Sequence, residues 1–192
     1  DQAVAETVEP RLTPADLLIG EALTSSATYE DVFAVWRNLV RTPAKREMLA
    51  EIVNFSGYRG YDVPVREIPG RSSELEIIID RGGSEAARAW MRPGPTVWLP
   101  DLFKTGRNDP PYAGGRFFLT FNRSVDAHRV QDILTLIARA GSRRVTLVGI
   151  GQAAAWVELA AAIAPVKVAV RLENPELGKM FIPGLARTGF SY

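Results

Sequence analysis

Residues 144–166 read RVTLVGIGQAAAWVELAAAIAPV, and this stretch indicates the fold class. It opens with the apolar run Val145–Gly149, whose length and β-branched residues predict a buried strand. A turn of small residues follows, and then Gln152–Ala164, an alanine-rich segment typical of a helix. A strand that leads through a short turn into a helix is the repeating unit of α/β proteins.

Strand and helix patterns alternate on both sides of this unit. The further predicted strands are Leu75–Asp80, Thr96–Phe103 and Val166–Leu172, the further predicted helices are Ser84–Met91 and Ser124–Ala140, and Lys104–Gly115 is a predicted loop. We therefore expect an α/β domain over residues 58–192, with a mostly parallel sheet flanked by helices. Capped amphipathic patterns that start near Thr13, Thr28 and Thr42 predict an N-terminal helical segment over residues 1–57.

Composition excludes several classes of function. The chain has 192 residues with 23 basic and 22 acidic side chains, so its net charge of +1 gives no footprint for nucleic acid. No apolar run reaches the ~18 residues of a membrane span. With no cysteine and one histidine, thiolate and multi-histidine metal sites are excluded, and we expect no metal and no cofactor. The polar leader Asp1–Pro10 favours export after removal of a signal peptide, to the periplasm or the exterior, with the cytoplasm as the alternative.

The turn after the central strand permits three interpretations. In the first, Gly149, Gly151, Gln152 and Ala153 form a degenerate nucleophile elbow, in which small outer residues let strand and helix approach. The central residue, Gly151, has no side chain, so the scaffold is present and the nucleophile is absent. In the second, Gly149, Gly151 and Ala154 form a dinucleotide fingerprint, and Glu173 is the ribose-binding acid. In the third, the small residues serve close packing alone.

Partners for a nucleophile are missing as well. Hydrolases of this type place the acid and the histidine after the nucleophile, but no Asp, His or Cys follows Gly151, and the only later serine is Ser191. His128 lies upstream among Gln131, Asp132 and Thr135, so we expect it on a solvated helix surface. Thr105 is the alternative nucleophile within the chain, in a loop with no base nearby in sequence.

Several segments together resemble the α/β-hydrolase superfamily, in particular acetyl xylan esterase and dienelactone-hydrolase-like proteins. The similar stretches are VWLPDLFKTGRND (97–109), FFLTFNRSVDAHRVQDILTLIARA (117–140), residues 144–166 as quoted above, and MFIPGLARTGF (180–190). The resemblance implies that Arg81, Gly82 and Gly83 match the loop that supplies part of an oxyanion hole. It also implies that Gly151 matches the nucleophile and that the Gln152 N–H matches the second oxyanion donor.

The resemblance implies that the family's acid and histidine would come from strands beyond residue 190. We therefore expect a non-catalytic, esterase-like domain that serves as a structural or interaction module. The alternatives are an active carbohydrate-ester hydrolase whose catalytic half is not in this chain, and a dinucleotide-binding Rossmann-like protein. A sheet that stops after Val166–Leu172 has an open edge, so we expect a protein partner or further chain to cover it near Met180, Phe181 and Ile182.

Overall fold

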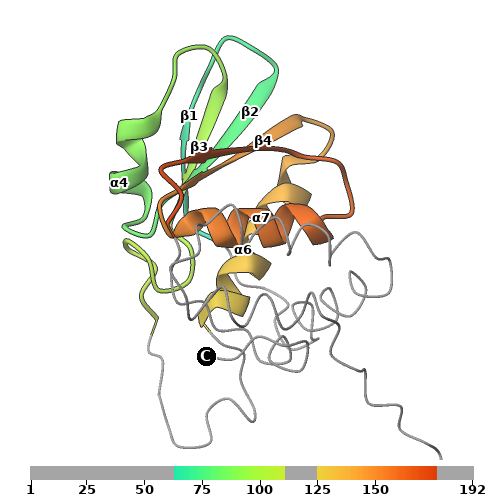
Figure 1. Cartoon of the computed structure of the whole chain (residues 1–192). Helices are drawn as coiled ribbons and strands as arrows, with labels where there is room; N and C mark the ends of the chain where they lie inside the picture. Colours follow the sequence, from blue (N-terminus) through green and yellow to red (C-terminus); the bar gives the residue numbers. More distant parts are fainter. Residues whose placement is uncertain (1–62, 111–124, 177–192) are drawn as a thin grey trace, which may run out of the picture.

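The computed structural model describes residues 63–110 and 125–176, and these residues form a five-stranded sheet (Figure 1). The strands lie in the order β1-β3-β2-β4-β5. β1 runs antiparallel to β3, and the remaining neighbours are parallel. The bounds of the strands are β1 Val65–Ile68, β2 Glu74–Ile79, β3 Thr96–Pro100, β4 Arg144–Ile150 and β5 Ala169–Glu173.

Helices lie on both faces of the sheet. The short helix α4 (Ser84–Ala87) and the 3₁₀ turn η1 (Arg88–Trp90) connect β2 to β3. The helices α6 (Val125–Ala140) and α7 (Ala153–Ile163) precede and follow β4. The chain moves in one direction from β2 to β3, and then returns past β2 to β4 and β5. Because crossovers between parallel strands are right-handed, this reversal places α4 on one face and α6 with α7 on the other.

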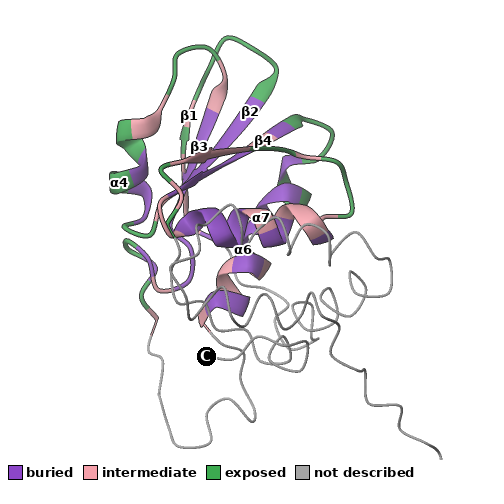
Figure 2. Cartoon of the chain, viewed as in Figure 1, coloured by how far each residue is buried: buried purple, intermediate pink, exposed green. Residues whose placement is uncertain are grey.

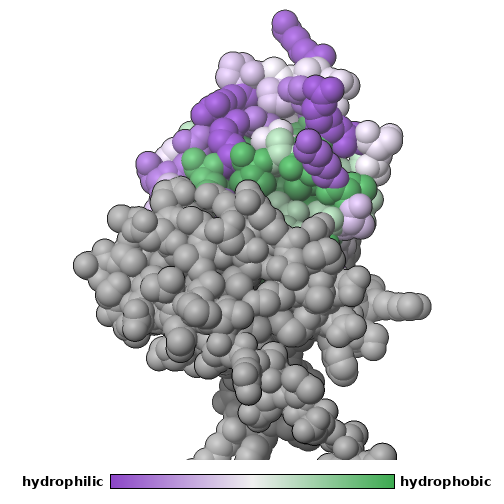
Figure 3. All heavy atoms as spheres, turned by 45° about the vertical axis from the view of Figure 1, so that its right-hand side comes forward, coloured by the Kyte–Doolittle hydropathy of each residue, from purple (hydrophilic) through white to green (hydrophobic). Residues whose placement is uncertain are grey.

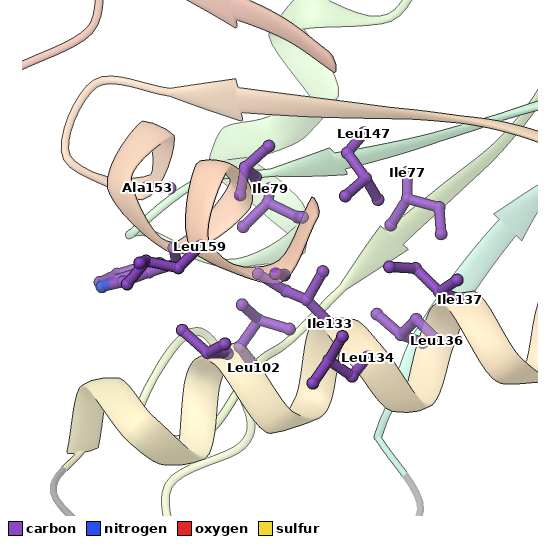
Figure 4. Close-up of a cluster of buried hydrophobic side chains, with 14 of the residues drawn as sticks. Ile77, Ile79, Leu102, Ile133, Leu134, Leu136, Ile137, Leu147, Ala153 and Leu159 are labelled. Atoms are coloured by element: carbon purple, nitrogen blue, oxygen red, sulfur yellow. The ribbon is translucent and has the colours of Figure 1, made fainter. Parts of the chain in front are cut away.

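The larger core lies between the sheet and the pair α6 and α7 (Figure 4). It combines alternate residues of β2 and β4 with the inner faces of both helices, and its side chains are closed to solvent (Figure 2). Its members include Leu75, Ile77, Ile79, Val130, Ile133, Leu136, Ile137, Val145, Leu147, Trp156, Val157 and Leu159. Burial of these side chains, at about 25 cal/mol per Å² of apolar surface, is the main force that holds the three layers together.

A smaller core lies on the opposite face, under α4 and η1. It contains Ile78, Ala87, Val97, Leu99, Val148 and Ile150. On β2, Leu75, Ile77 and Ile79 face the larger core, whereas Ile78 faces the smaller one. Glu76 shares the face of Ile78 and accepts a hydrogen bond from Arg171, so this face of the strand is only partly apolar.

The predicted α/β class is confirmed, and the element bounds differ in detail. β1 was not predicted, because its sequence VREI is only partly buried and lacks the apolar run of the inner strands. β5 begins at Ala169 instead of Val166, and β3 ends at Pro100 instead of Phe103. The predicted helices of residues 1–57, the domain boundary at residue 58 and the segment Met180–Ile182 lie outside the described residues.

None of the helices in the described ranges 63–110 and 125–176 combines the length and the apolar character that a membrane crossing requires.

Candidate functional site

The carboxyl ends of β2 and β4 form the point where the winding of the sheet reverses. Ligands of open α/β sheets bind at such a point, because the loops that follow the two strands diverge there. The register pairs Ile79 with Gly149, so Asp80 and Ile150 follow at the same level. The structure therefore brings the predicted oxyanion loop and the predicted elbow to one edge, which we call the switch-point edge and define as residues 80–83, 150–153, 173 and 176.

The glycines of the turn have different physical roles. A Cβ atom on Gly149 would lie 2.8 Å from the Cα of Ala154 and 3.1 Å from a methyl group of Val157. Gly149 is therefore required for close approach of β4 and α7. Gly151 has a φ of 53°, in the left-handed region, and the nearest atom to its added Cβ would be the Glu176 carboxyl carbon at 3.8 Å. Glycine is thus favoured at position 151 by the backbone conformation, and the surroundings leave room for a side chain.

The loop after β2 bonds to itself and to the turn before α7. The Asp80 carboxylate accepts the Gly82 N–H at 2.7 Å, and the Asp80 carbonyl accepts the Gly83 N–H at 3.0 Å. The Arg81 guanidinium donates to the side-chain oxygen of Gln152 at 2.5 Å. The predicted oxyanion donors of this loop, Gly82 and Gly83, are therefore engaged within the protein.

Residues that follow β5 complete the switch-point edge. The Gly151 N–H donates to the Glu173 carbonyl at 3.0 Å, and the Glu176 N–H donates to the Gly151 carbonyl at 3.2 Å. The Glu173 carboxylate accepts a hydrogen bond from Arg92 at 2.8 Å and lies 3.1 Å from Nε of Arg171. The acid of the dinucleotide interpretation therefore already has two cationic partners, and a second carboxylate, that of Glu176, lies beside the turn.

Asp101, directly after β3, forms a second polar centre and is 1% exposed. Its carboxylate accepts the Ser84 N–H at 2.7 Å, which anchors the start of α4, and the Arg107 Nε–H at 3.2 Å. Burial raises the pKa of Asp101. The N–H and hydroxyl of Ser84 and the Arg107 guanidinium together lower it by more, so the pKa of Asp101 lies below its ordinary value. A Cβ atom on Gly106 or Gly83 would overlap this carboxylate, so both positions are limited to glycine.

Side chains of α6 hold the loop after β3. The Asp132 carboxylate, 3% exposed, accepts the Phe103 N–H at 2.7 Å. Arg129 donates to the carbonyls of Phe103 at 3.0 Å and Lys104 at 3.2 Å. Burial raises the pKa of Asp132 to about 7, although the Phe103 N–H and Arg129 oppose this shift.

Arg129 also connects this loop to α7. Its guanidinium lies 4.3 Å from the centre of the Trp156 ring and 3.3 Å from the Asp126 carboxylate, which accepts the Trp156 indole N–H at 2.9 Å. Burial lowers the pKa of Arg129, Asp126 raises it, and the charge of Arg81 at the switch-point edge lowers it. The net result is a pKa of Arg129 below its ordinary value, with burial as the largest cause.

On this side of the molecule the fully solvated position expected for His128 is wrong, and the structure also places Thr105. His128 is partly buried and stacks on Phe103 with 4.4 Å between ring centres, and its neighbour Asp132 is buried, so this helix surface is not simply solvated. Thr105 is 3% exposed and its hydroxyl donates to the Leu102 carbonyl at 2.9 Å, so it is a structural residue of the loop rather than a nucleophile.

The sequence reasoning also missed the polar clusters around Asp101 and on α6. Asp126 and Arg129 share a helical face with Val130 and Ile133. Charged residues on an otherwise apolar helix face indicate a buried polar cluster, and this signal was available in the sequence. Asp101 left no local signal, because the helix start that it binds, at Ser84, lies 17 positions earlier in the chain.

The edge strand β5 is paired with β4 alone among the described strands. Val170 within β5 is 38% exposed, and Val166, which precedes the strand, is 52% exposed. Figure 3 shows hydrophobic residues gathered beneath a hydrophilic top on one face of the molecule. An exposed strand edge with apolar neighbours is the kind of surface that pairs with another chain.

Within residues 63–110 and 125–176, no group of three or more metal-ligating side chains is present. No family model, curated protein or solved structure matches this chain. The described residues define an α/β protein with a mixed, mostly parallel sheet.

Proposed function

We propose that this protein is a non-catalytic, α/β-hydrolase-like domain that acts as a structural or interaction module. The observation that carries the proposal is Gly151. It occupies the tight turn between β4 and α7 with a φ of 53°, next to Gly149, which packs directly on α7. A nucleophile elbow requires this strained turn and small flanking residues, but it also requires a reactive side chain at the centre.

The arrangement of the two loops supports the relation to hydrolases. In an α/β-hydrolase, the oxyanion hole combines the N–H after the nucleophile with an N–H from a loop between an earlier strand and its helix. Here Gln152 follows Gly151, and the loop Arg81–Gly83 joins β2 to α4 at the neighbouring strand end.

The hydrogen bonds of the same loops argue against catalysis. Gly82 and Gly83 donate to Asp80, and Arg81 donates to Gln152. A donor that already has a protein acceptor stabilises a developing oxyanion only if that bond is broken first. The Gly82 and Gly83 amides of the switch-point edge thus stabilise their own loop in place of a reaction intermediate.

The interaction role is supported by the edge strand β5 and the exposed side chains of Val166 and Val170. An apolar surface beside a strand edge favours contact with another chain, because such contact removes the apolar groups from water. The surface at β5 therefore favours a protein partner.

The test combines an activity assay with native mass spectrometry of the protein from its source. We expect no hydrolysis of p-nitrophenyl acetate above the buffer rate, no covalent adduct with a fluorophosphonate, and a mass above that of the chain alone. Ester turnover that a serine-directed phosphonate abolishes would refute the proposal. A matched variant, Thr105→Val, serves as the control for the alternative nucleophile.

No observation favours the dinucleotide-binding alternative. Glu173 is paired with Arg92 and Arg171, and the Glu176 carboxylate lies near Gly151, where it would repel a phosphate. We expect no thermal stabilisation by millimolar NAD, since a ligand that binds only the folded state would raise the unfolding temperature.

A further inference from the structure

The segment Leu102–Asn108, which we call the strap, leaves β3 and lies against α6 at the carboxyl edge of the sheet. Its own bonds keep it compact: the Thr105 N–H donates to the Leu102 carbonyl, and the Asn108 N–H donates to the Thr105 carbonyl, both at 2.9 Å. Asn108 also donates to the Asp101 carbonyl at 3.0 Å. These contacts fix the shape of the strap, but they do not attach it to α6.

Polar attachment to α6 is concentrated at the backbone of two adjacent residues, Phe103 and Lys104. Asp132 accepts the Phe103 N–H, and Arg129 donates to the carbonyls of Phe103 and Lys104. Lys104 has a φ of 58°, a backbone conformation that costs a side-chain-bearing residue about 1 kcal/mol or more. The α6 side chains thus hold the strap at its strained point.

We propose that Asp132 is a proton-linked latch, which holds the strap on α6 when its carboxyl group is neutral and favours release of the strap when it is ionised. In the closed state the carboxyl group is buried between the strap and α6. When the strap leaves, water reaches the carboxyl group, and the ionised form is no longer penalised. The neutral acid retains a carbonyl oxygen that can accept the Phe103 N–H, so protonation does not remove this bond.

The direction of the effect follows from the two states of Asp132. Its pKa is about 7 in the closed structure, because burial outweighs the Phe103 N–H and the charge of Arg129, and 3.8 is the ordinary value expected once it is solvated. Closing therefore takes up a proton between these two values. By linkage, the closed state is most favoured below pH 4 and loses that advantage as the pH rises to about 7.

Charged groups on the surrounding elements do not reverse this direction. They are Asp126, His128 and Arg129 on α6, Arg81 after β2, Lys104 and Arg107 in the strap, and Glu158 on α7, and the His128 ring stacks on Phe103. Of these, Arg129 is the side chain that acts on the pKa of Asp132, and it acts to lower it.

The experiment is amide hydrogen exchange of the full chain from pH 5 to pH 8, with each rate divided by the intrinsic rate at that pH. We expect the protection of the Phe103 amide to fall by up to about tenfold per pH unit as the pH rises to 7, and to level off above it. The Leu147 amide in β4 reports global opening, and its protection is expected to stay above that of Phe103 throughout.

Two variants separate the latch from other acids. Asp132→Asn keeps an oxygen for the Phe103 N–H and cannot titrate, so the protection of Phe103 is expected to become independent of pH. Asp109→Asn removes an exposed carboxylate near the same strap and is expected to behave as the wild type. A pH-independent Phe103 amide in the wild type, or the wild-type profile in Asp132→Asn, overturns the proposal.

A measurement on the wild type covers the case in which Asp132→Asn does not fold. The carboxyl ¹³C resonance of Asp132 is followed through a pH titration. A midpoint near 7, with the Phe103 amide shifting at the same pH, supports the latch. A midpoint near 4 overturns it, because the closed state would then bind no extra proton.

Discussion

Replacement of Gly149 by alanine tests whether the turn after β4 is set by packing. The added Cβ would lie 2.8 Å from the Ala154 Cα and 3.1 Å from a methyl group of Val157, closer than real Cβ contacts. The first neighbour is backbone of α7, so it cannot rotate away, and α7 must shift from the sheet. Overpacking of this kind costs about 1–3 kcal/mol, and we expect Gly149→Ala to lower the free energy of unfolding by about 2 kcal/mol.

The assay is urea unfolding, in which a lower midpoint with an unchanged slope reports lost stability. Gly151→Ala and Gly141→Ala are the matched controls, because these glycines have φ values of 53° and 64° but no close neighbour for a Cβ. Both are expected to cost about 1 kcal/mol, from backbone strain alone. If Gly149→Ala unfolds within about 0.5 kcal/mol of the wild type, the packing role of Gly149 is refuted.

Three further substitutions test the polar clusters by urea unfolding. The raised pKa of Asp132 predicts that the wild type loses up to about 4 kcal/mol of unfolding free energy between pH 4 and pH 7. This decline should disappear in Asp132→Asn, which cannot titrate. A wild type that is equally stable at both pH values would contradict this expectation. Asp101→Asn should cost about 1–3 kcal/mol at pH 7 and less on acidification, because a lowered pKa stabilises the fold only above the ordinary value of 3.8; an equal cost at pH 7 and pH 3 would argue against the charge of Asp101. Trp156→Phe removes the indole donor to buried Asp126 and should cost about 2 kcal/mol, whereas an unchanged midpoint would show that this bond adds nothing.

Hydrophobic periodicity predicted the central strands and long helices, because a buried parallel strand and an amphipathic helix leave strong signals over several residues. β1 left no such signal, since its residues Val65–Ile68 are only partly buried and its pairing with β3 depends on tertiary contact. The position of β5 was predicted three residues early. Pro165 and the exposed Val166 precede the strand, and apolar character alone does not separate an exposed approach from a paired strand.

The candidate site was predicted in part. Sequence spacing indicated the turn at Gly149 and Gly151 and the loop at Arg81–Gly83, and the parallel sheet brings them to one edge. The sequence did not reveal that Arg81 bonds to Gln152, because these residues are separated by 71 positions. Long-range polar pairs of this kind depend on the register between strands, which local patterns do not determine.

The hydrogen bonds of the carboxyl edge bear on whether this edge presents free groups to a substrate. A catalytic edge presents donors and acceptors to a substrate, and leaves them to water until the substrate arrives. Here Asp80 accepts the Gly82 N–H within its own loop, Arg81 donates to the Gln152 side chain across the winding reversal, and Asp101 is enclosed by Ser84 and Arg107. Each of these groups contributes to the order of a loop, so the edge that would bind a ligand is rigid and largely self-satisfied. Among the described residues, the exposed apolar surface lies instead at β5, where Val166 and Val170 lie at a strand edge. Contact with another molecule would remove this surface from water.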